Sequence, residues 1–370
     1  MGLNLTISFA TALVALLICL QVTVLLLWIE RKGSALIQDR VGANRANLLG
    51  GVLPFNLGIV NTMLADPLKL LTKEDIVPAT ADRFLHWLAP WMAVFPLFLT
   101  FAVVPFGDVV VIGGREINLQ AVQLSGGILF VLAMVSLGVY GMIIGGWASN
   151  SRYAFLGGVR GSAQMISYEI AMGLALVSVT LTYGTLDLQQ IARAQGQLMW
   201  GVVPAWGIFY QPIAFVLFLI AGIAESKRSP FDLPEAENEL VAGFQTEYSG
   251  SKMSMFMMSD FIEVAIVAAL TTTLFFGGWQ VPFLYRDGFH FPGGLTVAVP
   301  SLVVTLLQIV AFLVKLFVFC WIQILIRWSL PRLRYDQLMA FGWKKLLPVG
   351  LANAAASAVL VLLLQGWTGA

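Results

Sequence analysis

Apolar runs of about 20 residues recur along the whole chain, with polar segments between them. A helix of roughly 20 apolar residues is long enough to cross a hydrocarbon core about 30 Å thick. The pattern therefore predicts an all-α polytopic membrane protein with about eight transmembrane helices, of which the fifth is short and has no clear start. The eight runs lie at about 6–28, 87–106, 122–146, 162–183, 206–223, 259–278, 299–326 and 346–366.

The polar segments carry patterns of their own. Segment 50–71 begins with Gly-Gly-Val-Leu-Pro and then places apolar residues at helical spacing, which predicts an interfacial amphipathic helix that Pro67 should kink or split. Segment 107–121 has β-branched residues on both sides of Gly113-Gly114, which predicts a small outer β-hairpin. We find no internal repeat, so residues 1–370 are predicted to form a single membrane domain, with the outer segments 184–205 and 279–298 as caps.

Composition and the distribution of charge set the class and the orientation. The chain is 59% hydrophobic with a mean hydropathy of +0.85, typical of an integral membrane protein. Seventeen of its 21 Lys and Arg lie in segments 30–86, 147–161, 224–258 and 327–345. The alternate segments hold only Arg115, Arg193 and Arg286. The positive-inside rule then predicts that the large loops 30–86 and 224–258 are cytoplasmic and that both termini lie outside, on the periplasmic side of a bacterial inner membrane.

The first apolar run argues against a cleaved signal peptide, and the cysteines argue against a redox centre in this chain. The first run has no basic residues before it and continues into Glu30-Arg31-Lys32, so a cleaved signal peptide is not expected. Cys19 and Cys320 lie in apolar runs, and the two histidines, His86 and His290, are far apart. Iron–sulfur clusters need about four thiolates and haem needs axial ligands. We therefore predict no metal, redox centre or resident cofactor in this chain.

Acidic residues are concentrated in one polar segment. Helix capping explains part of this, because Asp232 or Leu233 could cap a helix that starts at Pro234, with Glu235 and Glu237 in its first turn. Capping does not explain the other acids, and Glu235 and Glu239 would repel each other at i,i+4. The alternative is a proton-bearing polar cavity, since ionisable groups at membrane depth are costly and usually functional. The acids of this segment are Glu225, Asp232, Glu235, Glu237, Glu239 and Glu247, six of twenty in the chain.

Four charged residues fall inside the predicted spans. Glu169 lies about eight residues, or roughly 12 Å, from the cytoplasmic end of its run. Asp260 and Glu263 share one helix face at i,i+3, and Lys315 lies near the middle of the seventh run. A structural interpretation is a buried salt bridge, such as a Lys315–Glu263 pair. A functional interpretation is a proton relay, and Glu169 is the residue that fits it best.

Two basic clusters follow the first and the seventh runs. The first contains Arg31, Gln38 and Arg40, and the second contains Arg332 and Arg334. Anchoring to lipid phosphates accounts for both clusters as well as a functional site does, so composition leaves both interpretations open.

Read as strings, these segments resemble one family over nearly the whole chain and in order. The matching strings are Glu30-Arg31-Lys32 with Gln38-Asp39-Arg40-Val41-Gly42, Ala65-Asp66-Pro67-Leu68-Lys69-Leu70 with Lys73-Glu74, Ser149-Asn150-Ser151-Arg152-Tyr153, Ala163 to Glu169, Glu225 to Gly250 and Arg332 to Met339. The long run SPFDLPEAENELVAGFQTEYSG is far more specific than any short motif. The family that the chain resembles is the H subunit (subunit 1 in mitochondria) of proton-pumping NADH–quinone oxidoreductase, respiratory complex I.

The resemblance implies a role without a redox centre. It implies that the chain forms part of a quinone chamber together with hydrophilic partner subunits, which hold the FMN, the iron–sulfur clusters and the NADH site, and that it contacts neighbouring membrane subunits. Quinone is then the substrate, and its reduction is coupled to proton translocation. The implied chamber residues are Arg31, Gln38, Arg40, Asp66, Arg228, Phe231, Arg332 and Arg334. The implied proton path is Glu169, Glu225, Asp232, Glu235, Glu247 and Asp260.

Some positions depart from the family pattern, and other functions remain open. Ala43 replaces a family proline, the Gln-Pro before Ala65 is absent, and Asp260-Phe261 replaces Glu-Tyr, which puts a chamber contact at Phe261 in doubt. One alternative is the homologous membrane subunit of a hydrogenase or of a ferredoxin-linked quinone reductase. Another is a stand-alone ion transporter, although no pair of broken helices marks two matching halves.

Overall fold

The computed structural model describes residues 2–42, 58–112, 115–199, 203–291 and 296–368. Within these residues, seven helices are long and apolar enough to cross a membrane, and an eighth apolar helix, α8 (Pro212–Glu225), is shorter. The predicted all-α polytopic class is therefore confirmed. The seven are α1 (Gly2–Ile37), α3 (Arg83–Phe101), α4 (Gly127–Ala148), α5 (Arg152–Tyr183), α10 (Gly250–Phe275), α11 (Ser301–Ser329) and a last helix made of α12 (Tyr335–Phe341), a π-helical turn (Gly342–Leu346) and α13 (Leu347–Thr368).

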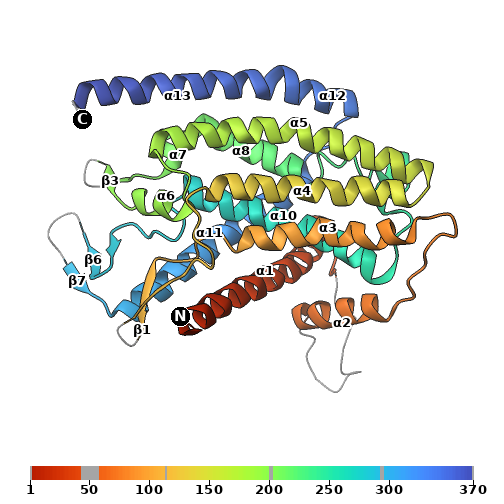
Figure 1. Ribbon diagram of the computed structural model, residues 1–370, viewed down its shortest axis with the longest axis horizontal. Helices are drawn as coiled ribbons and strands as arrows, with labels where there is room; N and C mark the ends of the chain where they lie inside the picture. The colour runs from red at the N-terminus through yellow and green to blue at the C-terminus, as the bar shows by residue number, and fades with distance from the viewer. Residues whose placement is uncertain (1, 43–57, 113–114, 200–202, 292–295, 369–370) are drawn as a thin grey trace.

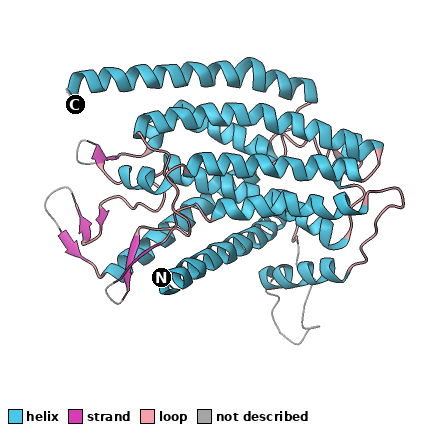
Figure 2. Cartoon of the chain, viewed as in Figure 1, coloured by secondary structure: helices cyan, strands magenta, loops and turns pink. Residues whose placement is uncertain are grey.

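The helices lie side by side, and the strands are confined to one end of the bundle, toward which both chain termini point (Figures 1 and 2). The strands form hairpins of β1 (Val109–Ile112) with β2 (Arg115–Asn118) and β3 (Leu198–Met199) with β4 (Val203–Pro204), and a three-stranded sheet of β5 (Leu284–Tyr285), β6 (Gly288–His290) and β7 (Thr296–Ala298). The predicted hairpin at 107–121 is confirmed, with Ile112 paired to Arg115, while its Gly113-Gly114 turn lies outside the described residues. Helix α6 (Leu188–Ala194) lies at the same end of the bundle (Figure 1).

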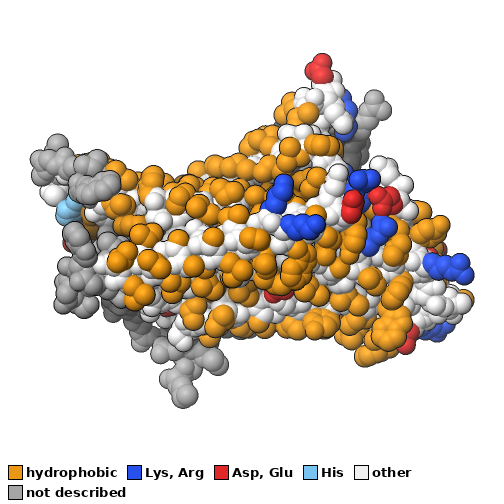
Figure 3. Space-filling view, turned by 90° about the horizontal axis from the view of Figure 1, so that it is seen from above, with side chains coloured by type: hydrophobic (Ala, Val, Ile, Leu, Met, Phe, Trp, Pro, Cys, Tyr) orange, Lys and Arg blue, Asp and Glu red, His pale blue; other side chains and the backbone are white. Residues whose placement is uncertain are grey.

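The flank and the ends of the bundle differ in polarity. In the view of Figure 3 most of the flank is hydrophobic, and charged side chains gather toward the end opposite the strands. Large apolar side chains are exposed on several helices, as expected for surfaces that face lipid. Examples are Phe95 on α3, Leu129 on α4, Ile166 on α5 and Leu306 on α11.

Helix α10 is the centre of the core. Every residue from Ser259 to Phe275 is buried. Close helix packing elsewhere depends on small residues, and Gly141 of α4 is the clearest case, because a Cβ there would lie 2.5 Å from the backbone nitrogen of Ala93 on α3. The burial of α10 from Ser259 onward places its polar residues in that stretch inside the protein rather than against lipid.

The fifth predicted run, 206–223, is interrupted. It divides into α7 (Gly207–Tyr210) and α8, and Gln211 between them has non-helical backbone angles. The cause is Pro212, because a residue before proline is disfavoured in the helical region. The Gln211 side chain bonds to Ser357 of α13 at 2.9 Å and to Thr182 of α5 at 3.0 Å, so the break also ties the last helix to the bundle.

The interfacial helix, α2 (Gly58–Thr72), is present. It runs through Pro67 as one helix, so of the two predicted effects, a kink or a split, the split does not occur. The preceding Gly-Gly-Val-Leu-Pro segment at 50–54 and Ala43 lie outside the described residues.

One buried carboxylate connects the outer segments. Asp108, just before β1, accepts bonds from the guanidinium groups of Arg193 at 2.9 and 2.7 Å and of Arg286 at 3.0 and 2.9 Å. These two arginines belong to the segments predicted as caps. Two of the three arginines in the alternate segments therefore have a structural role.

Candidate functional site

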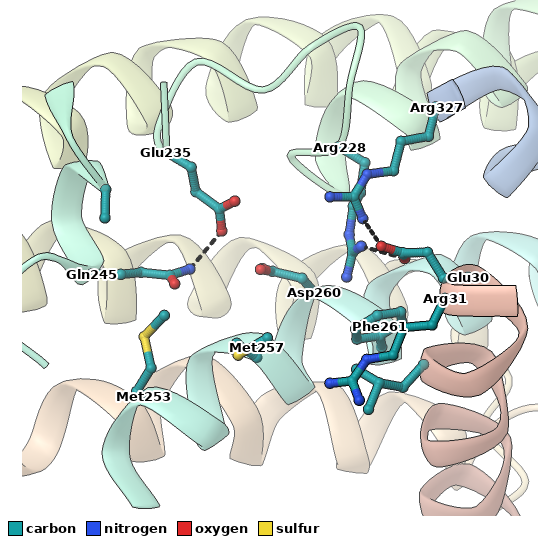
Figure 4. A pocket seen from close by; sticks show the side chains of 12 residues that line it. Glu30, Arg31, Arg228, Glu235, Gln245, Met253, Met257, Asp260, Phe261 and Arg327 are labelled. Atoms are coloured by element: carbon teal, nitrogen blue, oxygen red, sulfur yellow. Dashed lines mark hydrogen bonds and ion pairs between the residues drawn. The ribbon is translucent and has the colours of Figure 1, made fainter. Parts of the chain in front are cut away.

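A chamber of about 260 Å³ lies at the end of the bundle opposite the strands (Figure 4). Its wall combines charged side chains with apolar ones, which are Leu27, Met253, Met257 and Phe261. Four elements supply the lining: α1, the loop 226–249, α10 and the end of α11. The polar lining residues are Glu30, Arg31, Arg228, Glu235, Gln245, Asp260 and Arg327.

Glu30 organises the cationic side of the chamber. Its carboxylate accepts a bond from Arg228 at 2.7 Å and another from Arg327. The guanidinium carbon of Arg228 also lies 3.9 Å from the centre of the Phe261 ring, a cation–π contact. Phe261 lines the chamber, although it has no hydroxyl.

Glu235 projects toward the chamber from the other side (Figure 4). Its Oε1 accepts a bond of 2.6 Å from the Gln245 side chain. Burial raises the pKa of Glu235 to about 8, and the nearby carboxylates of Asp260 and Asp232 act in the same direction against Arg228 and Arg327. Glu235 is therefore a carboxyl group that holds a proton at neutral pH and can release it at slightly alkaline pH.

Behind the chamber lies a cluster of buried ionisable groups. The Lys227 ammonium is 3.1 Å from a carboxylate oxygen of Asp260 and 3.1 Å from one of Glu263. These three residues and Glu225 are each at most 6% exposed. Burial acts to lower the pKa of Lys227, but the carboxylates of Glu263 and Asp260 outweigh it, and the net effect is a raised pKa. Lys227 is thus a permanent cation among acids.

The loop 226–249 is held in place by glycines. Gly243 has φ of +55°, and a Cβ at that position would lie 1.7 Å from the carbonyl oxygen of Pro234. Gly157 of α5 packs equally closely, since a Cβ there would lie 2.8 Å from the same oxygen. Only glycine fits between these backbones, and this contact fixes the turn that presents Glu235.

The predicted helix starting at Pro234 is not formed. The loop helix is α9 (Glu237–Leu240), a single turn that follows Ala236, whose φ of 25° and ψ of 59° are not helical. The packing of Pro234 against Gly243 prevents the chain from coiling earlier. Glu235 is therefore outside any helix, and Glu239 pairs with Arg160 at 2.6 Å rather than facing Glu235.

The chamber brings together Arg31 and Arg228 from the predicted quinone residues and Glu235 and Asp260 from the predicted proton path. Asp66 on α2 borders it through a 2.5 Å ion pair with Arg31. Gln38 and Arg40 are exposed, bond to each other at 2.7 Å, and do not line the chamber.

The remaining predicted quinone residues lie elsewhere. Phe231 packs against Tyr168, with ring centres 5.5 Å apart, and lines a separate apolar groove between α8 and α12. Arg334 is exposed and pairs with Asp336 at 3.4 Å. Arg332 acts electrostatically on Asp232, yet its buried Nε and Nη2 have no hydrogen-bond partner among the described residues.

The other predicted proton-path residues are spread over α5, α8 and the loop. Glu169 is half-buried on α5, where its carboxylate accepts a bond from Ser136 of α4. Burial raises the pKa of Asp232, an effect that Arg332 and Arg327 oppose. Glu247 does not line the chamber; its backbone carbonyl lies 3.3 Å from the His86 ring, which stacks on Tyr248.

The predicted Lys315–Glu263 pair is not formed. The Lys315 ammonium donates to the carbonyl oxygens of Phe276, Gly278 and Gln280 at 2.8, 3.0 and 2.7 Å. The end of α10 leaves carbonyls without helical partners, and these satisfy the ammonium. Glu263 is paired with Lys227 instead.

Reasoning from the sequence did not assign functional roles to several residues of the site. No role was predicted for Glu30, Arg327 or Lys227, all of which lie in the polar segments rich in Lys and Arg. The Gln245 partner of Glu235 and the Met253 and Met257 wall were not noticed. A helical projection of α10 could have found the methionines, because residues 253, 257 and 260 recur on one face.

Comparison with known proteins agrees over almost the full chain. Residues 10–358 match the family model described as NADH dehydrogenase. The chain is 46% identical to the NADH-quinone oxidoreductase H subunit 2 of Geobacter sulfurreducens, over 99% of this chain and 98% of that protein. It is 46% identical to the H subunit 2 of Rhizobium meliloti, over 96% and 97% of the two chains, and 43% identical to subunit 8 of the Rhodothermus marinus enzyme, over 95% and 97%. The chain therefore belongs to the NADH dehydrogenase family, among whose members it is similar to the H subunit of NADH-quinone oxidoreductase, a multi-pass membrane subunit of complex I.

Proposed function

We propose that this chain forms the membrane part of a quinone-reduction site and couples the protonation of quinone to proton transfer among carboxyl groups within the membrane. The observation that carries the proposal is the chamber itself, whose lining combines the apolar side chains of Met253, Met257 and Phe261 with the carboxyl groups of Glu235 and Asp260. A quinone head group is a flat apolar ring with two carbonyl acceptors, so it needs both kinds of surface. Pockets for such ligands combine apolar walls with a few placed polar groups.

The electrons come from a partner subunit in this proposal. Relatives of this chain are named as subunits of an oxidoreductase for NADH and quinone. We assign NADH oxidation, FMN and the iron–sulfur clusters to hydrophilic partner subunits that cover the chamber, with further membrane subunits beside the bundle. Quinone accepts two electrons and two protons to become quinol, and this chain supplies groups that can donate the protons.

The proposed proton path begins at Glu235 and Asp260 in the chamber. Asp260 shares Lys227 with Glu263, and Glu263 and Glu225 line one small cavity. Glu225 interacts electrostatically with Glu169 on α5. Asp232 and Glu247 stay proposed members that flank this series. Interactions in a buried site are stronger than in water, so these carboxyl groups are expected to titrate as a coupled set.

The distribution of Lys and Arg supports a specific orientation. The end of the bundle with the chamber carries most of the basic residues, and the positive-inside rule therefore supports a cytoplasmic position for this end and a periplasmic position for both termini. The hydrophilic partners then dock from the cytoplasm, over Arg31, Asp66 and the loop 226–249.

A photoreactive quinone analogue tests the location of the substrate in the intact complex. With the reactive group on the quinone ring, labelled peptides should come from α1, the loop 226–249 and α10, and excess unlabelled quinone should suppress the labelling. Peptides from the lipid-facing part of α13 serve as the control and should show only labelling that quinone does not suppress. Competed labelling confined to the groove beside Phe231 would place the head group elsewhere and overturn the proposal.

A further inference from the structure

Lys227 is a residue whose role neither the chamber nor the proposed function explains. It follows α8 directly and is 6% exposed, although it carries a charge. Its backbone φ is +54°, in the left-handed region that non-glycine residues rarely adopt. A buried, strained lysine persists only where its surroundings require it.

The surroundings of Lys227 are three carboxyl groups. Its ammonium contacts Asp260 and Glu263 of α10, each at 3.1 Å. Glu225 lies two residues earlier, at the end of α8. One cation cannot neutralise three buried carboxylates, so the resting cluster must hold at least one proton.

Glu225 is the member of the cluster that receives least support in its charged form. Both of its carboxyl oxygens are buried without a hydrogen-bond partner among the described residues. A buried carboxylate without donors is far less stable than the neutral acid. Asp260 and Glu263, by contrast, each contact the ammonium. The proton therefore resides on Glu225.

Glu225 has neighbours to which a proton could pass. Glu225 and Glu263 line a cavity of about 20 Å³, which has room for one water molecule. The groups that act electrostatically on Glu225 are Glu263 on α10, Glu169 on α5 and Lys227 in the loop. Glu225 thus interacts both with an acid of the cluster and with Glu169.

We propose that Lys227 is a fixed counter-charge that keeps Asp260 and Glu263 ionised and leaves Glu225 as the carboxyl group that carries the exchangeable proton. Lys227 acts through its neighbours, so it is a positioning residue and carries no proton itself. The inference rests on the proposed function, because it assigns roles within the proposed proton path. It separates two carboxylates that are paired with the Lys227 ammonium, Asp260 and Glu263, from one carboxyl group that holds the proton, Glu225.

Opposite shifts of the pH profile test the inference. The intact complex would carry Lys227→Met, Glu263→Gln, both changes together, or Lys227→Arg, and protons pumped per electron would be measured across pH in proteoliposomes. Without the ammonium, Glu225 should bind its proton more tightly, and the alkaline limb of pumping should move up by at least about one pH unit. Glu263→Gln leaves the ammonium in excess, so the limb should move down by a similar amount.

The two remaining variants are matched controls. The double variant Lys227→Met/Glu263→Gln removes one charge of each sign and should return the limb to within about half a unit of wild type. Lys227→Arg keeps the cation and should behave as wild type. A purely structural role would lower the content of assembled complex without moving the limb. If the Lys227→Met complex fails to assemble, Glu263→Gln and the double variant still show in which direction the ammonium moves the alkaline limb.

The outcomes separate this inference from the proposed function. Shifts in the same direction, or none, in the single variants overturn the role of Lys227. Glu225→Gln, measured in parallel, reports on the proposed path: if it pumps as wild type does, the path itself is wrong. If it stops pumping while the single variants show no shift, the path stands and the role assigned to Lys227 is wrong.

Discussion

Replacing Glu235 by Gln is expected to reduce quinone-dependent proton pumping at least tenfold and to remove the fall in the rate of quinone reduction that we expect of wild type above about pH 8. Burial raises the pKa of Glu235 to about 8, so the carboxyl group holds its proton below that pH and loses it as the pH rises. Proton donation by Glu235 should therefore fail on the alkaline side. Glutamine cannot donate this proton and does not titrate.

The substitution keeps the local structure. The amide oxygen of the new side chain can accept the bond that Gln245 now donates to Glu235. Glu239→Gln is the matched control in the same loop, since Glu239 is half-exposed, pairs with Arg160 and does not line the chamber. It should change pumping less than twofold. An unchanged alkaline fall in the Glu235→Gln complex would show that another group donates the proton.

Replacing Glu30 by Gln is expected to lower the rate of quinone reduction about a hundredfold. Glu30 is the shared partner of Arg228 and Arg327, and all three side chains are largely buried. Removing one partner of a buried ion pair costs about 3–5 kcal/mol, because the remaining charges stay buried without compensation. A loss of about 3 kcal/mol corresponds to roughly a hundredfold in rate.

The measurement is quinone reductase activity per assembled complex in membranes. Glu30→Asp keeps the charge on a shorter arm and should recover part of the rate. Glu74→Gln is the control for a change of charge on an exposed part of the same face. Wild-type rates in Glu30→Gln would mean that the arginines do not need this carboxylate to shape the chamber.

The sequence predicted the elements better than it predicted the contacts. Hydrophobic run length and the Gly-Gly hairpin depend on local chemistry, and both appear where expected. The break before α8 was also within reach, because Pro212 requires it locally. Contacts between distant segments were not: Glu30 lies 198 and 297 residues from its two arginine partners. No spacing along the chain reveals which helix faces meet.

In the candidate site, too, the kind of site was predictable from the sequence and the contacts within it were not. The density of acids correctly indicated a polar cavity, and the loop that carries Glu235 does border one. The partner of each charge was not predictable, because a buried ion pairs with the carboxylates or backbone carbonyls that tertiary packing places next to it. Lys315 is satisfied by backbone carbonyls at the end of α10, and Lys227 takes the acids that Lys315 was expected to pair with.

The ratio of protons pumped to electrons transferred in the Glu225→Gln complex tests the central claim most directly. Glu225 is buried and interacts electrostatically with both Glu263 and Glu169, so removing its proton should stop transfer along the proposed series while quinone is still reduced. Electron transfer close to the wild-type rate, with a ratio reduced by half or more, is the predicted result. A wild-type ratio at a wild-type rate would contradict it and leave the buried acids with a structural role only.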